Sequence, residues 1–566
     1  MKRIDPLDLL GTSPVWCLDL LFGGEVFRLS TEPIDVKAAD GTMHSYRGGL
    51  AAPEVVANLG RLKFSTPELS AAIRCILPES AAKIRRRGHD WLGATAALYL
   101  TSIANGDRRL GVPVAMLSHS EMWLQVAGVV RSPQYAAPGD PAGAVEFTLE
   151  VAPWNETSPI LPPDVVISSE RFPGSGGIVG PPGSEALGKR YPLVFGTPGV
   201  YDSGTAPGSP MYAIERDGAG NAVFVLAARG QIDAATLLIY DSAGASASLS
   251  PIVFIDGTGE TVTYFSVGGG LDPVSGDFYA AWNDGGAFPS PYSAGPLTNA
   301  AEVAAYLFGR AGAPVDVPAW LALAGQVSDI QIDGYINDGS TAWEVVSAHV
   351  LPLIPVGYRY TRQGLAPVLY DPDMRRGDEV AHVRTVDTPA ATGFGDWTPT
   401  TGLTLETEPE DVVVRFTANY AKDVQSGAFL RQRSWVGDSI GAPDPAPLLS
   451  RRRGGQSGSL YVDQAATRGA TTTKSLDLPF VWQTTTADAV LSWRSKLAAM
   501  PTESATYEAP WHWGWVQVGD ALLVDDSLKG FTGQPALVGS KVWAGDSWEF
   551  ELIFDEDPVR DPRAID

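Results

Sequence analysis

The chain has 566 residues, of which 44% are hydrophobic and 19% charged, and its formal net charge at pH 7 is −24. This length suggests about four domains of ordinary size, and the composition is typical of a globular protein and not of a disordered one. The acidic balance argues against a protein that clamps DNA or RNA regardless of sequence, because phosphate affinity comes from Lys and Arg side chains that displace counterions.

Cysteines are scarce, since Cys17 and Cys75 are the only two. Such a number excludes a disulfide framework, and the sequence leaves open whether the two thiols pair. The N-terminus starts basic but is broken by Asp5, Pro6 and Asp8 before any sustained apolar run, so no signal peptide is expected. No window approaches the length of apolar sequence that a membrane span needs. We therefore expect synthesis in a reducing cytoplasm.

Residues 1–155 predict an antiparallel β domain. Asp40-Gly41 precedes the run from His44 to Tyr46 and predicts a hairpin turn. Apolar or alternating runs bounded by Gly, Pro or Asp-Gly predict strands at Val15–Phe22, Val26–Ser30, Met122–Val130 and Ala144–Val151.

A segment rich in Pro, Gly and Ser occupies residues 156–188 and is interpreted as a linker between domains. Strand patterns resume over residues 189–290, which predict a second β module. Its expected strands are Asn221–Ala228, Ala235–Tyr240, Thr261–Ser266 and Asp277–Trp282.

Residues 291–395 predict a mixed α+β domain. Asn299 can cap a first helix, within residues 297–312. Thr341 with Glu344 three residues later predicts a capping box, in which each side chain accepts a hydrogen bond from a backbone N–H of the other residue. The second helix should carry its apolar positions on one face and end at Pro352. A β-hairpin should follow, with its turn at Arg362-Gln363-Gly364.

Residues 396–566 predict a C-terminal β domain with one helix. The expected strands include Leu403–Glu406 and Asp411–Tyr420, and the helix is expected at Ala487–Met500. No repeat with a period of about 20 to 50 residues is present, so a solenoid or propeller is not indicated. The fold class is therefore mainly β with α+β insertions, as several domains around a mixed α+β middle.

No pattern of catalytic residues stands out. Ser439 lies in a G-x-S-x-G sequence, but the prolines at 443, 445 and 447 exclude the helix that must follow such a nucleophile. A Cys-His peptidase would pair Cys17 with His44 or His119, yet Cys17 lies in the apolar run VWCLDLLF and is interpreted as buried packing. No histidine has zinc-ligand spacing. We expect no enzyme, no cofactor and no metal.

Two surface candidates remain. Trp511, Trp513 and Trp515 alternate, so in a strand they would share one face. Burial in a core is the first interpretation of this row, a subunit interface the second and stacking on sugar rings the third. Arg451, Arg452 and Arg453 lie in a Pro/Gly-rich segment and are candidates for contact with a neighbouring protein.

Three blocks of the sequence resemble the tail-hub, or baseplate-hub, proteins of long-tailed bacteriophages. One is the order of AEVAAYLFGRAG, YINDGSTAWEVV and GYRYTRQGLAPVLYDPD within residues 301–373. The second is the ending VGDALLVD at 518–525 followed by PALVGSK at 535–541. The third is KRYPLVFG at 189–196, which is similar to the block that opens a middle domain in many of those proteins.

This resemblance implies a structural protein of the virion, made in the host cytoplasm. In that family the hub is a homotrimer at the distal end of the tail tube, and two β-barrel-like modules in each subunit make a ring that matches the hexameric tube. One barrel would lie near the N-terminus and the other among the later strands. Expected partners are the tail tube and distal tail proteins, fibre and tip proteins and the tape measure protein, while DNA passes without specific binding.

A protein of a different class competes with this expectation. A multidomain glycan-binding or glycan-degrading protein of the tail tip would use the tryptophan row against sugar rings. A trimer without hydrolase activity on cell-wall or capsular glycans favours the hub, and a monomer with a catalytic cleft favours the alternative.

Overall fold

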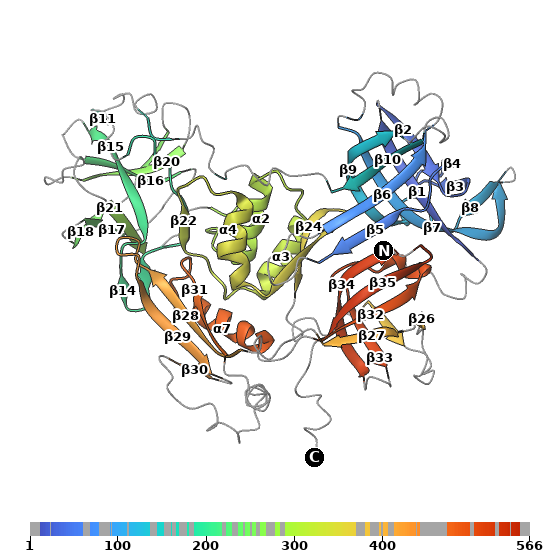
Figure 1. Cartoon of the computed structure of the whole chain (residues 1–566). Coiled ribbons are helices and arrows are strands. Elements are labelled where there is room, and N and C mark those ends of the chain that lie inside the picture. The colour runs from blue at the N-terminus through green and yellow to red at the C-terminus, as the bar shows by residue number, and fades with distance from the viewer. Residues whose placement is uncertain are drawn as a thin grey trace, which may run out of the picture. The chain divides into compact units, whose positions relative to one another are not determined.

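A computed structural model gives the fold of the chain (Figure 1). It describes residues 12–22, 24–59, 68–77, 91, 93–109, 112–135, 144–151, 160, 166–168, 178–179, 186–217, 222–228, 236–241, 244–249, 252–255, 261–267, 278–283, 289–369, 380–384, 396–397, 400–405, 413–436, 439–441, 472–498, 503–526, 531–543 and 545–554.

Contacts divide the chain into two compact units, each assembled from separate stretches. The first comprises Met1–Pro153, Gly357–Glu406 and Thr502–Asp557, and the second includes 154–356 and 407–501. These units cut across the five linear domains expected from the sequence, since 407–501 and 502–557 belong to different units. The linear division 1–155, 156–188, 189–290, 291–395 and 396–566 stays a prediction.

The first unit is built almost entirely of strands. Its N-terminal part contains β1 Pro14–Phe22, β2 Glu25–Ser30, β3 Ile34–Lys37, β4 Met43–Gly48, β5 Glu54–Asn58, β6 Glu68–Ile76, β7 Thr95–Arg109, β8 Val112–Ala115, β9 Trp123–Tyr135 and β10 Ala144–Glu150. Its later part contains β23 Val356–Thr361, β24 Gly364–Leu369, β25 Ala381–Arg384, β26 Asp396–Trp397, β27 Thr400–Leu405, β32 Glu503–Pro510, β33 Ala521–Asp526, β34 Phe531–Trp543 and β35 Ser547–Phe554, with a 3₁₀ turn η7 at Trp511–Trp515.

Six N-terminal strands close on themselves into a barrel. Consecutive pairings run β1–β2, β2–β4, β4–β3, β3–β8, β8–β7 and β7–β1. The hairpin predicted at Asp40-Gly41 is present, because β3 pairs with β4 and Gly41 has φ +84°. That positive φ explains the need for glycine at this turn.

Strands β1, β2 and β7 form a wall with a different environment on each side. One side carries Leu18, Leu20 and Phe22, which are all fully buried, and the sheet continues from β7 through β9 and β10 to β6. The other carries Cys17 and Asp19, and faces the strands β3, β4 and β8 that complete the barrel. Period-two alternation in one strand therefore lines two cores.

The later strands form a second β module that shares a ladder with the first. They pair in the order β27, β32, β35, β34, β33 and β25. Strand β34 also pairs with β5, in the register Ser540↔Asn58, Lys541↔Ala57 and Val542↔Val56. The predicted fold class, mainly β with barrel-like modules and α+β insertions, is confirmed.

The second unit combines sheets and helices. Its strands are β11 Ile178–Val179, β12 Leu193–Phe195, β13 Val200–Tyr201, β14 Gly204–Thr205, β15 Ser209–Asp217, β16 Ala222–Ala228, β17 Thr236–Asp241, β18 Gly244–Leu249, β19 Ile252–Ile255, β20 Thr261–Val267, β21 Phe278–Asn283, β22 Gly334–Ile336, β28 Val413–Lys422, β29 Phe429–Val436, β30 Ser439–Gly441 and β31 Thr472–Asp477. Its helices are α2 Ala300–Arg310, α3 Val317–Gln326, α4 Ala342–Val345, η3 Val346–Val350, η4 Leu351–Leu353 and α7 Thr484–Ala498. Each strand predicted in residues 189–290 has a counterpart.

The predicted helix starts are confirmed, but one predicted helix is different in kind. Asn299 accepts from Ala301 N at 3.0 Å, and Thr341 with Glu344 forms the full capping box. After one turn the second helix becomes a π-helix and then a 3₁₀ turn. Pro352 therefore lies inside the last 3₁₀ turn and does not end a regular α-helix. None of the helices in the described part of the chain has the length and apolar character that a membrane crossing requires.

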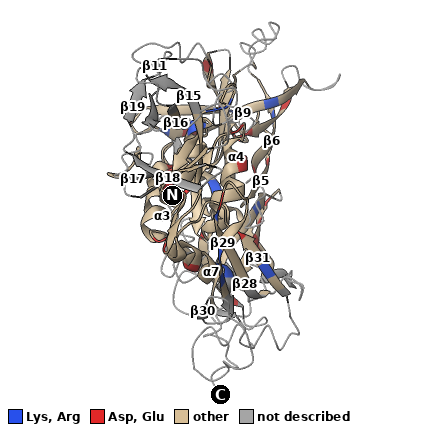
Figure 2. Ribbon diagram, turned by 90° about the vertical axis from the view of Figure 1, so that its left-hand side faces the viewer, with Lys and Arg blue, Asp and Glu red and all other residues tan. Residues whose placement is uncertain are grey.

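A four-stranded sheet packs against α7 (Figure 1). Val490 and Leu491 of α7 are fully buried, and the helix predicted at Ala487–Met500 is present as Thr484–Ala498. Arg433 of β29 makes a bidentate pair with Asp488 of α7, at 2.8 and 2.7 Å. Figure 2 shows basic residues along β29 and β31 in blue.

A buried carboxyl group holds strands β12 and β22 together in the second unit. Asp333 Oδ1 accepts from Thr197 N at 2.8 Å, while Oδ2 has no hydrogen-bond partner among the described residues. A Cβ at Gly196 would lie 2.2 Å from Asp333 Oδ1, so glycine is required there. Burial raises the pKa of Asp333 from 3.8 to about 6, although the hydrogen bond from Thr197 acts in the opposite direction.

Replacing Asp333 with Asn should remove a loss of unfolding free energy that increases with pH. A carboxyl group with a raised pKa in the folded state binds more protons when folded, so wild-type stability falls as pH rises through about 6. Between about pH 4 and pH 7.5, Asp333→Asn should gain about 3 kcal/mol relative to wild type. Urea unfolding across this range measures the gain, and Asp316→Asn, at a helix cap that asparagine also satisfies, is the control. A stability difference that is the same at every pH contradicts the assignment.

Candidate functional site

The three predicted tryptophans lie in a 3₁₀ turn, so the predicted strand is wrong here. Pro510 precedes the turn, and Val516 N closes it by donating to Trp513 O at 2.9 Å. Trp513 is 1% exposed, whereas Trp511 and Trp515 are half-buried. The alternation in the sequence therefore reflects a tight turn with one indole inside, and not an open row.

The turn joins a cluster of indoles contributed by both β modules of the first unit. Trp16 of β1 lies with its ring centroid 5.4 Å from that of Trp543 and 5.9 Å from that of Trp548. Trp123 of β9 lies 6.2 Å from Trp511 by the same measure. Trp548 Nε1 also donates to Trp511 O at 3.0 Å. Aromatic pairs at these separations add to the stabilisation that comes from their burial.

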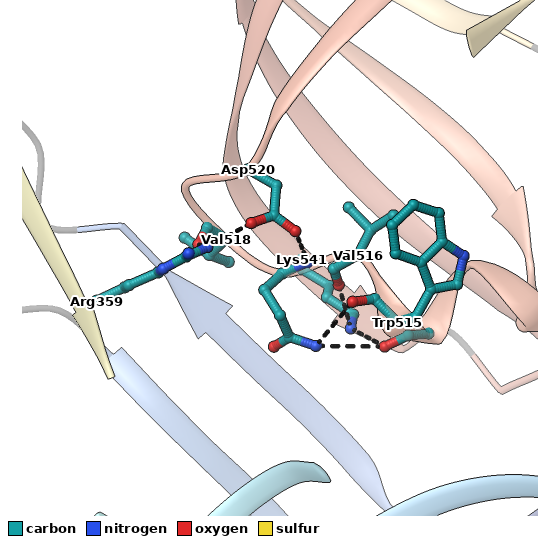
Figure 3. A network of polar contacts seen from close by, with 8 residues as sticks. Arg359, Trp515, Val516, Val518, Asp520 and Lys541 are labelled. Carbon is teal, nitrogen blue, oxygen red and sulfur yellow. Dashed lines mark hydrogen bonds and ion pairs between the residues drawn. The ribbon is translucent and has the colours of Figure 1, made fainter. Parts of the chain in front are cut away.

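Lys541 of β34 is buried and contacts this cluster at the ring of Trp548, and Figure 3 shows it beside Val516. Its Nζ donates to Gln125 Oε1 at 2.8 Å, to Gly514 O at 2.8 Å and to Val516 O at 2.7 Å. It also lies 4.1 Å from the ring centroid of Trp548. Three acceptors match the three N–H donors of an ammonium group, and the indole face favours the cation.

Burial lowers the pKa of Lys541, and the charge of Asp520 acts in the opposite direction. The Gln125 amide completes the network, because its Nε2 donates to Trp123 O and Gly514 O. Gly514 is required by close approach, since a Cβ there would lie 2.5 Å from Leu100 Cδ2. The arrangement is a satisfied buried polar network between two sheets.

A second joint adjoins the first and involves the hairpin of β23 and β24. Arg359 Nη1 donates to Val518 O at 2.8 Å and to Asp520 Oδ1 at 2.6 Å (Figure 3). Asp520 Oδ2 accepts from Gln517 N at 2.8 Å. Gly519 has φ +85°, and a Cβ there would lie 2.6 Å from Val368 Cγ2. The two blocks GYRYTRQG and VGDALLVD therefore contact each other directly.

Cys17, His44 and His119 border the same barrel interior, but their chemistry does not suit a peptidase. Burial raises the pKa of the Cys17 thiol, and the charge of Asp19 raises it further, so no thiolate is available. His119 Nε2 instead contacts Asp19 Oδ2 at 2.9 Å. Cys17 and Cys75 are both free and buried, so they do not pair.

The remaining candidates give no site in the described part of the chain. Ser439 begins strand β30, which pairs with β29, and is not at a turn into a helix. Among the described residues no three His, Cys, Asp or Glu side chains could hold a metal ion. Arg451, Arg452 and Arg453 lie outside the described residues.

Sequence reasoning missed Lys541 and Gln125. Lys541 follows Val538, Gly539 and Ser540 in a strand, where a lysine ordinarily points to solvent. Its partner Gln125 is 416 residues away. No local pattern could have indicated this pair.

No protein-family model and no curated protein matches the chain. Among solved structures it is similar to the tail protein from Neisseria meningitidis MC58, at 10% identity over 96% of this chain and 97% of that one, with a TM-score of 0.35. It is similar to a 43 kDa tail protein of prophage MuSo2 from Shewanella oneidensis, at 8% identity over 96% and 100% of the two chains, with a TM-score of 0.36. A chain in the virion of a native gene transfer agent particle gives 13% identity, 69% and 91% coverage and a TM-score of 0.36.

Replacing Lys541 with Met should loosen the joint between the two β modules. The change leaves the Gln125 and Val516 oxygens without their buried donor and should cost about 2 to 4 kcal/mol of unfolding free energy. Differential scanning fluorimetry and urea unfolding measure the loss. Lys37→Met, at an exposed lysine of β3 in the same unit, is the matched control and should change little. Equal stability of the two variants contradicts a stabilising network.

Proposed function

We propose that the protein is a structural component of a phage tail, namely the hub at the distal end of the tail tube. The observation that carries this proposal is that the blocks resembling hub proteins form the internal joints of the fold. Arg359 and Asp520, from two of those blocks, make an ion pair at 2.6 Å. Residues that maintain a rigid scaffold are what a structural component requires.

The third block behaves in the same way in the second unit. Leu193 and Val194 of KRYPLVFG pair with Ile336 and Tyr335, which open the YINDGS block, and Phe195 pairs with the preceding Gly334. The buried Asp333, directly before β22, accepts a hydrogen bond from Thr197 N, two residues after β12. These observations support a scaffold in both units.

In this proposal the protein acts mechanically. Three copies close the tube during assembly, hold the distal tail, fibre and tip proteins, contact the tape measure protein and open for DNA ejection. The protein resides in the virion, at the tail tip. The net charge of −24 supports a lumen that repels DNA phosphates and lets the genome pass. An assembled ring with a basic or neutral lumen contradicts that part of the proposal.

The burial of one member of the tryptophan row weakens the glycan hypothesis. Trp513 is 1% exposed, so its indole cannot stack on a sugar ring. The half-buried Trp511 and Trp515 have ring centroids 6.2 Å from Trp123 and 6.4 Å from Trp513, respectively.

The location can be tested on assembled particles. Gold-labelled antibody against this chain should mark one end of the tail. Deletion of its gene should give particles without complete tails, because in this proposal the hub closes the tube during assembly. Electron microscopy of the deletion strain, with the wild-type gene supplied in trans as the control, measures both. Label on the capsid, or complete tails after deletion, would contradict the proposal.

A further inference from the structure

The β3–β4 hairpin, residues 34–48, is joined to its neighbours in the N-terminal barrel by short backbone ladders. Among the described residues, β4 pairs with β2 only at Leu29 and Ser30, and β3 pairs with β8 at a single position, Asp35↔Val114. In contrast, β1 pairs with β7 along almost its whole length. The attachment of the hairpin therefore depends on its side chains more than on ladder hydrogen bonds.

The base and the tip of this hairpin are held by different side chains. At the base, Ile34 and Tyr46 are buried. Two residues nearer the turn, His44 lies on the same face of β4 as Tyr46. The ring centroid of His44 lies 5.3 Å from that of His119, at an interplanar angle of 74°. His119 also donates from its backbone N to Lys37 O at 2.8 Å. A histidine pair therefore connects the tip of the hairpin to the segment that follows β8.

A single carboxylate balances the positive groups of the opposite wall. Asp19 Oδ2 of β1 contacts His119 Nε2 at 2.9 Å, and Asp19 Oδ1 lies 3.7 Å from Arg28 Nε of β2. Arg28 and His119 therefore share Asp19. A proton on His44 would place a further positive charge beside them without adding a carboxylate.

The other groups around the histidine pair supply little negative charge. Asp40 in the turn favours a positive His44, but it is exposed and accepts hydrogen bonds from Thr42. Asp35 lies on the opposite face of the hairpin, where Ser45 donates to it at 2.6 Å. Lys37 is exposed, and Arg362 acts on Tyr99 with a positive charge. The groups whose pKa values are raised by burial, and which stay uncharged, are Cys17, Tyr46 and Tyr99.

The closed hairpin does not accommodate a second proton on the His44 ring. Nδ1 of His44 is buried and has no hydrogen-bond partner among the described residues. A neutral imidazole can leave this nitrogen without a hydrogen, whereas an imidazolium donates from both nitrogens. Protonation would therefore bury a donor without an acceptor. Burial, and then the charges of Arg28 and His119, lower the pKa of His44, while Asp19 and Asp40 act in the opposite direction.

We propose that the β3–β4 hairpin is an acid-released flap, which opens from the barrel when His44 takes up a proton. In the open state both ring nitrogens of His44 can bond to water. Because the closed state disfavours the charged ring, the open state binds protons more readily as the pH falls below 6.5, and above that value the flap stays closed. The flap gives the first unit a response to acid, which goes beyond the structural role proposed above and does not depend on it.

Hydrogen–deuterium exchange of the full-length chain, followed by mass spectrometry, tests the flap. Uptake of one proton on opening should raise the opening equilibrium of the amides in residues 34–48 by up to about tenfold for each pH unit below 6.5. Exchange is measured between about pH 7.5 and about pH 5 and is corrected for the intrinsic pH dependence of amide exchange. Amides of β32 and β35, which lie in the same unit outside the barrel, are the internal reference and should keep their protection.

Two variants isolate the contribution of His44. His44→Phe keeps a ring against His119 and removes the titrating nitrogens, and His44→Gln is the polar alternative if phenylalanine does not pack. In each variant, residues 34–48 should exchange as slowly at about pH 5 as at about pH 7.5, because no proton is taken up at this position. His512→Gln, in the tryptophan turn, is the matched control and should keep the wild-type response to acid.

Wild-type and variant data can each overturn the proposal. Equal protection of residues 34–48 at both pH values in the wild type contradicts release by acid. An acceleration that persists in both His44 variants assigns the response to another group. A loss of protection in β32 and β35 to the same extent as in the hairpin indicates unfolding of the whole unit and not a local opening.

Discussion

The first unit depends on one buried ammonium group. Lys541 belongs to β34, the strand that pairs with β5 and thereby continues the N-terminal sheet into the C-terminal one. Its three hydrogen bonds reach β9 through Gln125 and the tryptophan turn through Gly514 and Val516. A ladder of only a few paired residues would by itself fix the register between β34 and β5 weakly. A fully satisfied polar group fixes the register, because any shift by one residue would leave a buried charge without partners.

The two units join segments that are distant in the sequence by different buried polar groups. The first uses the Lys541 cation, which lies among indoles and donates its three hydrogen bonds to three carbonyl oxygens. The second uses Asp333, whose Oδ1 accepts from Thr197 and whose Oδ2 has no partner among the described residues. The satisfied group stabilises its joint, while the half-satisfied carboxyl opposes stability once it ionises. Stability of the two units should therefore respond differently to pH.

Glycines in the resembling blocks have specific steric causes. A Cβ at Gly196 would meet Asp333 and a Cβ at Gly519 would meet Val368, while outside these blocks a Cβ at Gly514 would meet Leu100. Gly196 and Gly519 also have positive φ, which side chains other than glycine rarely adopt. The blocks are thus patterns of close backbone approach at joints.

The sequence by itself determined the elements whose causes are local. Period-two alternation located the strands of both β modules, and Asn299 and the pair Thr341 and Glu344 located helix starts, because caps and alternation depend on residues a few positions apart. It also determined that Cys17 is packing and not a nucleophile. Only the tertiary structure decided that Trp511 to Trp515 form a turn, that Lys541 is buried against Gln125, and that the last strands belong with the first. The physical reason is that such contacts join residues hundreds of positions apart, and a lysine or a tryptophan has the same local pattern whether its environment is water or a second sheet.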